Sequence, residues 1–507
     1  MPKLKVTRSL QRLKKADLSD AGSSHKQLEK SIEIDEDAAK ISFARRCVTK
    51  QVTSDHSDTS AAEHPGSPRD PHPSASEEDE DEDQEETEAD DEQGTSKKTR
   101  EGHVITVTAE HKSSNWHTLI NSFVCFIGAG ILDLPYAFKE SGWLLGTVLL
   151  TLIALMAQQC MYWVVDCKYA LINRGHNVQT YGDVGFYALG KAGQYLVEGC
   201  LLLTQMSFCI AYIIFISHNV NAVFPVLSTT TVVLMVLPIL TGLCLLRSLA
   251  KFAPVSLLAE VANAAGIVVI FFYDFEQITD SAPVTAAMAP TTLPFFFGVA
   301  IYCYEGVGMV LPIESNMANK EDFRKVWGWS MCLVTTLFLV FGIFGYLSFG
   351  ADTAEIITLN LPATSGAASS VKLALSLGLL CTYPVMLFPV FEILEEAALS
   401  KFGGARTASA PFFSPPELLR SALRCGVVVF TAVCALLIPN FGVFLSFVGA
   451  STCSMLAFCL PATFNLLIRG RGPNGSLKQA VASVVVIVLG MFGAIIGTYV
   501  NVVAMSS

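Results

Sequence analysis

The chain has 507 residues, of which 51% are hydrophobic and only 16% charged, and its formal net charge is −11. A soluble domain carries about a quarter of its residues as charged side chains, so this composition excludes an ordinary soluble protein. We expect a membrane protein that contacts lipid and has no nucleic-acid partner.

Residues 1–115 form a polar, acidic tail. They hold 17 Lys and Arg against 26 Asp and Glu, and so account for −9 of the total charge. They bury too little apolar surface to offset the entropy of ordering, so we expect a disordered tail. Its run Glu77–Glu92, preceded by Ser74 and Ser76, is typical of a solvated charge run. An acidophilic kinase site or a sorting segment, each with its own partner protein, is the alternative.

Residues 116–507 form the predicted transmembrane domain. It contains eleven apolar runs of about 20 residues or more, the length that a membrane-spanning helix needs. These runs do not alternate as the strands of a membrane barrel do, so we predict an all-α integral membrane fold. The eleven predicted helices are His117–Phe138, Trp143–Asp166, Ala192–His218, Ser228–Leu246, Phe252–Tyr273, Leu293–Ile313, Val326–Phe349, Ser369–Ala397, Arg420–Ile438, Phe441–Leu467 and Gln479–Val503.

The Lys and Arg residues between these helices predict the orientation in the membrane. If the tail is cytosolic, the cytosolic loops hold nearly all of them, and the opposite face keeps only Lys139 and Lys372. Eleven crossings then put the C-terminus, Ser507, on the lumenal side. The sequon Asn474-Gly475-Ser476 falls in a cytosolic loop of this topology, where no glycan is added, and we interpret it as chance.

The first and sixth helices share an unusual pattern. The first contains Gly128-Ala129-Gly130 and then Leu134-Pro135, and the sixth contains Gly306-Val307-Gly308 and then Leu311-Pro312. Glycine costs about 1 kcal/mol inside a helix and proline about 3, so both helices are predicted to break in mid-membrane. Matching interrupted helices are typical of the binding site of a secondary transporter. Close helix packing through the glycines is the alternative, but it does not explain the prolines.

The two breaks predict the chemistry of the site. A broken helix exposes N–H groups at one end and carbonyls at the other, which together suit the carboxylate and ammonium of a zwitterionic amino acid. Glu305 stands beside the second break and Asp133 inside the first. Charged residues in mid-membrane are functional candidates, and a desolvated carboxyl group can carry a proton through the transport cycle. A structural role for Glu305 is an equal alternative, and a structural role is favoured for Glu198 and Glu260.

The sequence contains no enzyme signature. It has no nucleotide-binding loop, nucleophile elbow or zinc pattern, and its histidines lack metal-ligand spacing. We therefore predict neither catalytic residues, nor a metal site, nor a cofactor.

The stretches FIGAGILDLPYAFKESGW (Phe126–Trp143) and YCYEGVGMVLPIE (Tyr302–Glu314) resemble the first and sixth helices of the amino acid/auxin permease family. The segments at Thr204–Ile216, Phe344–Gly350 and Ile438–Ser451 are similar to it too. The resemblance is strongest to the vacuolar amino-acid transporters of plants and fungi, then to the proton-coupled amino-acid transporters of animals.

This resemblance implies a fold of the LeuT type, with helices 1–5 related to helices 6–10 as inverted repeats and one extra helix. It implies proton-coupled symport of neutral amino acids across the vacuolar or lysosomal membrane towards the cytosol, with the plasma membrane as the alternative location. The substrate-binding residues that it implies are Gly128, Ala129, Gly130, Ile131, Tyr304, Glu305, Gly306 and Gly308, with Ser207 and Tyr212 on helix 3 and Thr382 on helix 8.

Asp133 departs from the family pattern, which usually has a small residue at this position. It is a candidate for a lumenal gate or a second proton site, or for selection of cationic substrates. Two other functions remain open: an amino-acid sensor that signals through the tail, and a sodium-coupled transporter with oxygen ligands near Thr382 and the first break.

Overall fold

The computed structural model describes residues 98–100, 103–105, 112–246, 249–277, 284–288, 290–362, 365–401, 415–438, 440–470 and 477–506. Before residue 112 it describes only a small antiparallel hairpin, β1 (Lys98–Arg100) paired with β2 (His103–Ile105). The predicted disordered tail otherwise lies outside the described residues, as do the acidic run Glu77–Glu92 and the sequon at Asn474.

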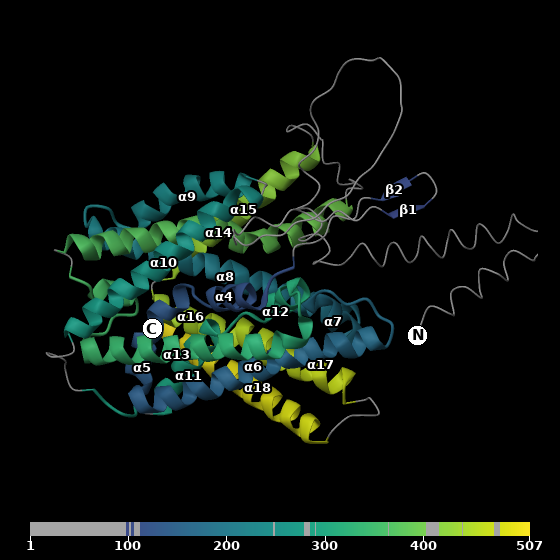
Figure 1. Cartoon of the computed structure of the whole chain (residues 1–507). Helices are drawn as coiled ribbons and strands as arrows, with labels where there is room; N and C mark the ends of the chain where they lie inside the picture. Colours follow the sequence, from purple (N-terminus) through teal and green to yellow (C-terminus); the bar gives the residue numbers. More distant parts are fainter. Residues whose placement is uncertain are drawn as a thin grey trace, which may run out of the picture.

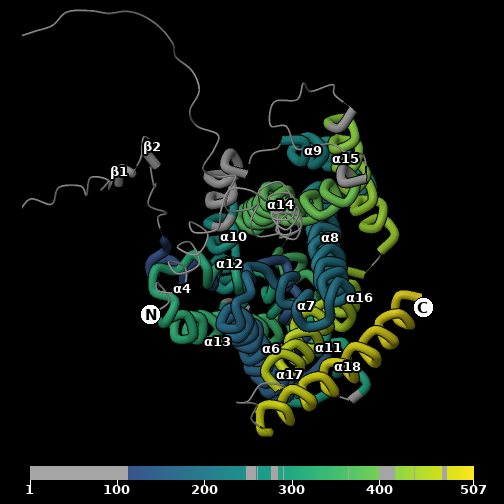
Figure 2. Tube along the Cα trace, turned by 90° about the vertical axis from the view of Figure 1, so that its right-hand side faces the viewer, coloured from purple at the N-terminus to yellow at the C-terminus, as the bar shows by residue number. Residues whose placement is uncertain are grey.

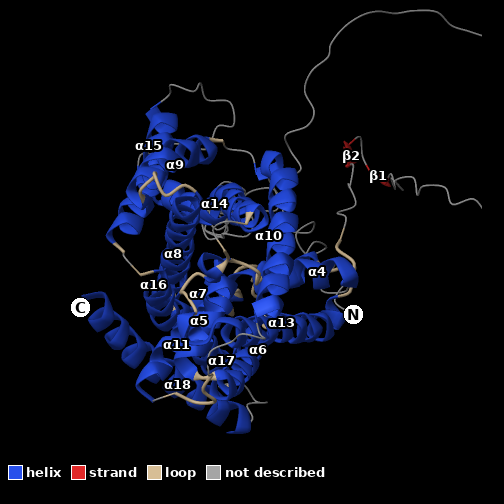
Figure 3. Cartoon of the chain, turned by 90° about the vertical axis from the view of Figure 1, so that its left-hand side faces the viewer, coloured by secondary structure: helices blue, strands red, loops and turns tan. Residues whose placement is uncertain are grey.

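The rest of the described chain is a bundle of helices (Figures 1 and 3). The α-helices are α4 (Asn115–Cys125), α5 (Leu134–Ser141), α6 (Trp143–Asn173), α7 (Tyr181–Leu189), α8 (Lys191–Val223), α9 (Thr229–Leu245), α10 (Leu249–Gln277), α11 (Leu293–Cys303), α12 (Val307–Asn316), α13 (Phe323–Phe349), α14 (Gly366–Lys401), α15 (Pro415–Leu437), α16 (Phe441–Val448), α17 (Leu460–Ile468) and α18 (Leu477–Ser506). Short 3₁₀ turns are η1 (Ala129–Asp133), η3 (Pro290–Thr292), η4 (Lys320–Asp322), η5 (Gly350–Asp352) and η6 (Ile357–Asn360), and π-helical turns are η7 (Gly449–Cys453) and η8 (Met455–Cys459).

Each of the eleven predicted segments contains a helix. Among the described residues, eight helices are long and apolar enough to cross a membrane, and the bent pair Asn115–Cys125 and Ala129–Ser141 makes a ninth crossing if it is one span. Two further apolar helices, Thr229–Leu245 and Val261–Phe275, are shorter. The all-helical membrane domain is therefore confirmed, whereas the count of eleven crossings stays a prediction.

The outer helices present apolar side chains to their surroundings. Figure 2 shows α18 at one edge of the bundle and α9 with α15 at another. In the most apolar 18-residue stretch of α15, and likewise of α18, only 28% of the residues are buried inside the protein. Exposed side chains include Phe492 and Tyr499 on α18 and Phe430 on α15. Such wide apolar surfaces fit contact with lipid.

Helices far apart in the sequence pack against each other in the interior. α14 packs on α8 and α10, and α11 packs on α16 and η7. The bundle has two ends. We call the end where α4 begins and α12 ends the tail end, and the end where α5 ends and α16 begins the far end.

The structure adds elements that the sequence analysis did not predict. The helix α7 begins after Thr180, whose hydroxyl accepts the N–H of Asp183, while the Asp183 carboxylate accepts the N–H of Thr180. This reciprocal capping box stabilises the start of the helix. The tenth predicted segment is interrupted by the π-helical turns η7 and η8 between α16 and α17.

Candidate functional site

The first predicted break is present between α4 and α5. The helix α4 ends at Cys125, Gly128 is extended with φ −141° and ψ −164°, and the chain continues as the 3₁₀ turn η1. The two halves of the span meet at an angle of 49°. All five residues of η1 are buried, so this irregular backbone lies in the protein interior, as membrane depth demands.

The second predicted break lies between α11 and α12. The helix α11 ends at Cys303 and α12 begins at Val307, with Tyr304, Glu305 and Gly306 between them. The sixth predicted segment is thus two half-helices, and its interruption falls beside Glu305.

The two breaks lie against each other. A Cβ atom built on Gly130 would lie 2.9 Å from the ring of Tyr302 and 3.0 Å from the sulfur of Cys303. A Cβ atom on Gly306 would lie 2.8 Å from the ring of Phe126. Each break therefore needs its glycine, because a side chain next to the other break packs against it at that point.

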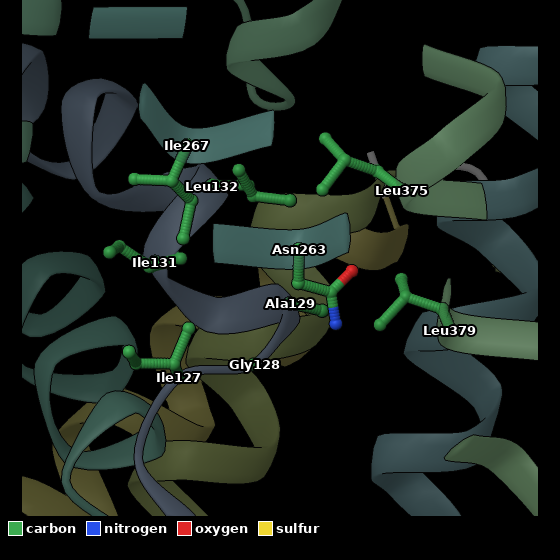
Figure 4. Close-up of a pocket in the computed structure, with 9 residues that line it drawn as sticks. All are labelled: Ile127, Gly128, Ala129, Ile131, Leu132, Asn263, Ile267, Leu375 and Leu379. Carbon is green, nitrogen blue, oxygen red and sulfur yellow. The ribbon is translucent and has the colours of Figure 1, made fainter. Parts of the chain in front are cut away.

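A small cavity lies beside the first break (Figure 4). Its volume is about 10 Å³, which is barely enough for one water molecule and far too small for an amino acid. This conformation is therefore closed around the breaks. The cavity is lined by Ile127, Gly128, Ala129, Ile131, Leu132, Asn263, Ile267, Leu375 and Leu379.

Asn263 on α10 is a cavity residue that the sequence analysis missed. Its side chain reaches towards Ala129 in Figure 4, and its Oδ1 atom is buried without a hydrogen-bond partner among the described residues. A polar side chain in an apolar span was a usable signal, because such residues usually serve function.

The predicted site residues divide into two groups. Gly128, Ala129 and Ile131 line the cavity. Gly130, Gly306 and Tyr212 lie at the breaks, and the Tyr212 hydroxyl would be 3.9 Å from a Cβ on Gly128.

The other predicted hydroxyl groups turn away from the cavity. Ser207 donates to the Leu203 carbonyl at 2.7 Å, and Thr382 to the carbonyls of Gly378 and Leu379, each at 3.2 Å. Tyr304 donates to Thr335 on α13 at 3.1 Å. Gly308 faces Leu201 on α8. In this closed conformation, these four residues do not line the cavity.

Three carboxyl groups are buried without a full set of partners. Glu305 is 8% exposed and its Oε1 atom has no hydrogen-bond partner in the described part of the chain. Both oxygens of Asp133 and both of Asp274 on α10 are likewise buried and unpartnered. Asp274 was not singled out from the sequence. Uncompensated buried carboxyl groups are costly as anions, so each is a candidate carrier of a proton.

The tail end of the bundle is tied shut by polar contacts. Glu314 at the end of α12 accepts hydrogen bonds from Lys168 and Tyr169 on α6. Ser113, just before α4, accepts the N–H of Ala318 at 3.0 Å and donates its own N–H to the Asn316 carbonyl at 2.8 Å. These contacts join the outer ends of both broken helices. Among the described residues, no group of three His, Cys, Asp or Glu side chains could hold a metal ion.

The breaks, the cavity and the buried carboxyl groups can be compared with known proteins. Residues 111–503 match the family described as transmembrane amino acid transporter protein. The chain belongs to this family.

Curated members of the transmembrane amino acid transporter family cover nearly the whole membrane domain. Amino acid transporter AVT3B of Arabidopsis thaliana is 35% identical over 81% of this chain and 97% of its own length. The proton-coupled amino acid transporter-like protein pathetic of Drosophila melanogaster is 27% identical over 76% of this chain and 84% of its own length. A solved Na⁺-coupled sialic acid symporter matches 78% of this chain and 89% of its own, with 12% identity and a TM-score of 0.49.

Membership of the transmembrane amino acid transporter family confirms the resemblance seen in the sequence. The protein is an integral membrane transporter of amino acids and not an enzyme.

Proposed function

We propose that the protein is a proton-coupled secondary transporter of mainly neutral amino acids, which it moves across a vacuolar or lysosomal membrane into the cytosol. The name of the relative pathetic supports proton coupling. The described residues that line the cavity carry no charge of either sign, which supports neutral substrates, because the broken helices can bind both charges of a zwitterion. The acidic lumen of such a compartment would supply the driving gradient.

In this proposal, Glu305 binds and releases the coupled proton. It is a buried carboxyl group that lies in the second break, and one of its oxygens has no partner in the described structure. Opening the site would admit water to this carboxyl group and let it exchange a proton, and closing would remove that water again. Substrate and proton would then be enclosed together between the same half-helices.

Flux into reconstituted vesicles with an imposed pH gradient tests the proposal. A gradient of one pH unit supplies about 1.4 kcal/mol per proton, enough for about tenfold accumulation of a neutral amino acid. We expect wild type to accumulate substrate, and Glu305→Gln to lose accumulation while still exchanging substrate across the membrane. Accumulation that ignores the gradient, or that survives Glu305→Gln unchanged, would remove the proton-coupling role.

Glu198→Gln is the matched control. Glu198 is also a carboxyl group within a span, but it accepts a hydrogen bond from Gln194 at 2.9 Å and belongs to α8, not to either break. We expect this variant to keep gradient-driven accumulation. Replacing external sodium in the same assay tests sodium coupling, which would show as loss of accumulation in wild type.

A further inference from the structure

Asp133 occupies an unusual position between the first break and α16. It precedes α5, where aspartate is among the best capping residues, yet its side chain makes no capping bond. The carboxyl group instead faces α16: a Cβ atom built on Gly442 would lie 2.9 Å from its Oδ1 and 3.4 Å from its Oδ2. Glycine at position 442 therefore leaves room for this completely buried carboxyl group.

A second carboxyl group already occupies the start of α16. Glu355, in the segment between α13 and α14, accepts the N–H of Gly442 at 3.0 Å. Burial raises the pKa of Glu355 above its ordinary value; the N–H groups of Gly442 and Phe441 and the charge of Lys139 oppose this shift, whereas Glu140 adds to it. The helix N-terminus, which attracts anions, is thus used by Glu355, and Asp133 beside it has no donor among the described residues.

Among the described residues around Asp133, no cation is placed to pair with it. The titratable groups that act on it or that it acts on are Glu355, Glu140 and Tyr136, and Cys303 on α11. Lys139 on α5 instead donates to the Thr353 carbonyl at 3.1 Å and lies 4.8 Å from the centre of the Tyr136 ring. The helix α16 itself, Phe441–Val448, carries no titratable side chain.

Two neighbouring carboxyl groups cannot both stay ionised here at low cost. Burying an unpaired carboxylate costs several kcal/mol, and a like charge nearby adds to that cost. A single proton held by the pair removes the repulsion and leaves one negative charge, for which the N–H groups at the start of α16 are available. A proton on this pair would therefore stabilise the closed arrangement of α5, α16 and the α13–α14 segment.

We propose that Asp133 and Glu355 form a proton-binding site, separate from Glu305, that latches the far end of the bundle. When α5 and α16 separate, water reaches both carboxyl groups and the proton leaves. The far end thus closes in acid and opens as the pH rises. This inference rests on the proposed transport cycle, to which it adds a gate controlled by protons, but it does not depend on Glu305.

Hydrogen–deuterium exchange of the full chain in lipid nanodiscs, without substrate or gradient, tests the latch. The segments to follow are Leu134–Ser141 and Phe441–Val448, at about pH 5 and about pH 7.5, after correction for the intrinsic pH dependence of exchange. One linked proton changes the closing equilibrium by up to about tenfold per pH unit. We expect wild type to be more protected at the lower pH. Asp133→Asn should be protected at both, because its neutral amide removes the charge that repels Glu355.

Two further variants keep the result decisive. Glu355→Gln should also lose the pH response, and it decides the question alone if Asp133→Asn does not fold. Asp352→Asn removes an exposed carboxyl group from the same segment and should respond like wild type. A wild-type response in both Asp133→Asn and Glu355→Gln would overturn the latch. Glu305→Gln should keep the exchange response, so failure of the proton-coupled transport proposal would show in flux alone.

Discussion

Lys168 and Glu314 form a charge pair at the tail end of the bundle, with side chains that are only 6% and 0% exposed. Breaking such a buried pair on one side leaves an uncompensated charge, which costs about 3–5 kcal/mol. We therefore expect Glu314→Gln and Lys168→Met each to lower the midpoint of thermal unfolding in detergent strongly. The double variant should recover most of the loss, because neither charge remains and the new glutamine amide can still accept a hydrogen bond from Tyr169.

Lys325→Met provides the comparison for this pair. Its ammonium lies 3.5 Å from Asp322, but the side chains are 81% and 36% exposed. An exposed pair contributes about 0–1 kcal/mol, so this variant should unfold close to wild type. Equal losses in the single and double variants at positions 168 and 314 would show that the two charges are not coupled.

Single residues in the site could be predicted where the residue type alone, in its place in the sequence, has a structural consequence. The Gly and Pro pattern located both breaks because these residues are costly inside helices. The direction of a hydroxyl group is not visible in this way: Ser207 and Thr382 donate to their own helices in the closed conformation. The relation of Asp133 to Gly442 and Glu355 depends on packing between distant segments, and no local pattern encodes it.

The half-helix α11, which precedes the second break, packs closely against the backbone of the tenth predicted span. A Cβ atom on Gly449 would lie 1.9 Å from the carbonyl oxygen of Gly298 and 3.0 Å from the backbone nitrogen of Tyr302. Because these are backbone atoms, no side-chain movement can relieve the clash. Gly449→Ala should push α11 away, cost about 1–3 kcal/mol or more in unfolding free energy, and reduce amino-acid flux in vesicles.

Gly426→Ala on α15 is the matched control for Gly449→Ala. A Cβ atom there meets no atom within 4 Å. Alanine is the better helix former by about 1 kcal/mol, so this variant should be as stable as wild type or more so and should transport normally. If Gly449→Ala behaved in the same way, the close contact between α11 and η7 would not be needed for folding or transport.

Helices as elements were predictable because each apolar run had the length that a membrane requires. The short helix α7 was missed because it lacks such a run, although Thr180 and Asp183 have capping-box spacing. The π-helical turns at Gly449–Cys453 and Met455–Cys459 lie inside a continuous apolar segment, and neither composition nor periodicity marks them. Breaks made by glycine and proline can thus be read from a sequence, whereas a change of helical pitch cannot.

The number of crossings is a property of the whole molecule, and it decides the side on which each loop lies. It depends on α9 and α10, and above all on α9, which is the shorter. With 17 residues, α9 is about 26 Å long, slightly less than the roughly 30 Å hydrocarbon core. Such a helix can still cross, because a bilayer thins locally at a modest cost. If α9 and α10 both cross, there are eleven crossings and the two chain ends face opposite sides.

Glycosylation of the sequon at Asn474 tests the number of crossings, and it needs no added tag. With eleven crossings and a cytosolic tail it faces the cytosol, so Asn474→Gln should leave the electrophoretic mobility of the protein from eukaryotic cells unchanged. An epitope fused after Ser507 should be protected in sealed vesicles whose cytosolic face is outward, while one before Met1 should be digested. If α9 or α10 did not cross, every later loop would change sides, Asn474 would face the lumen, and both chain ends would be digested together.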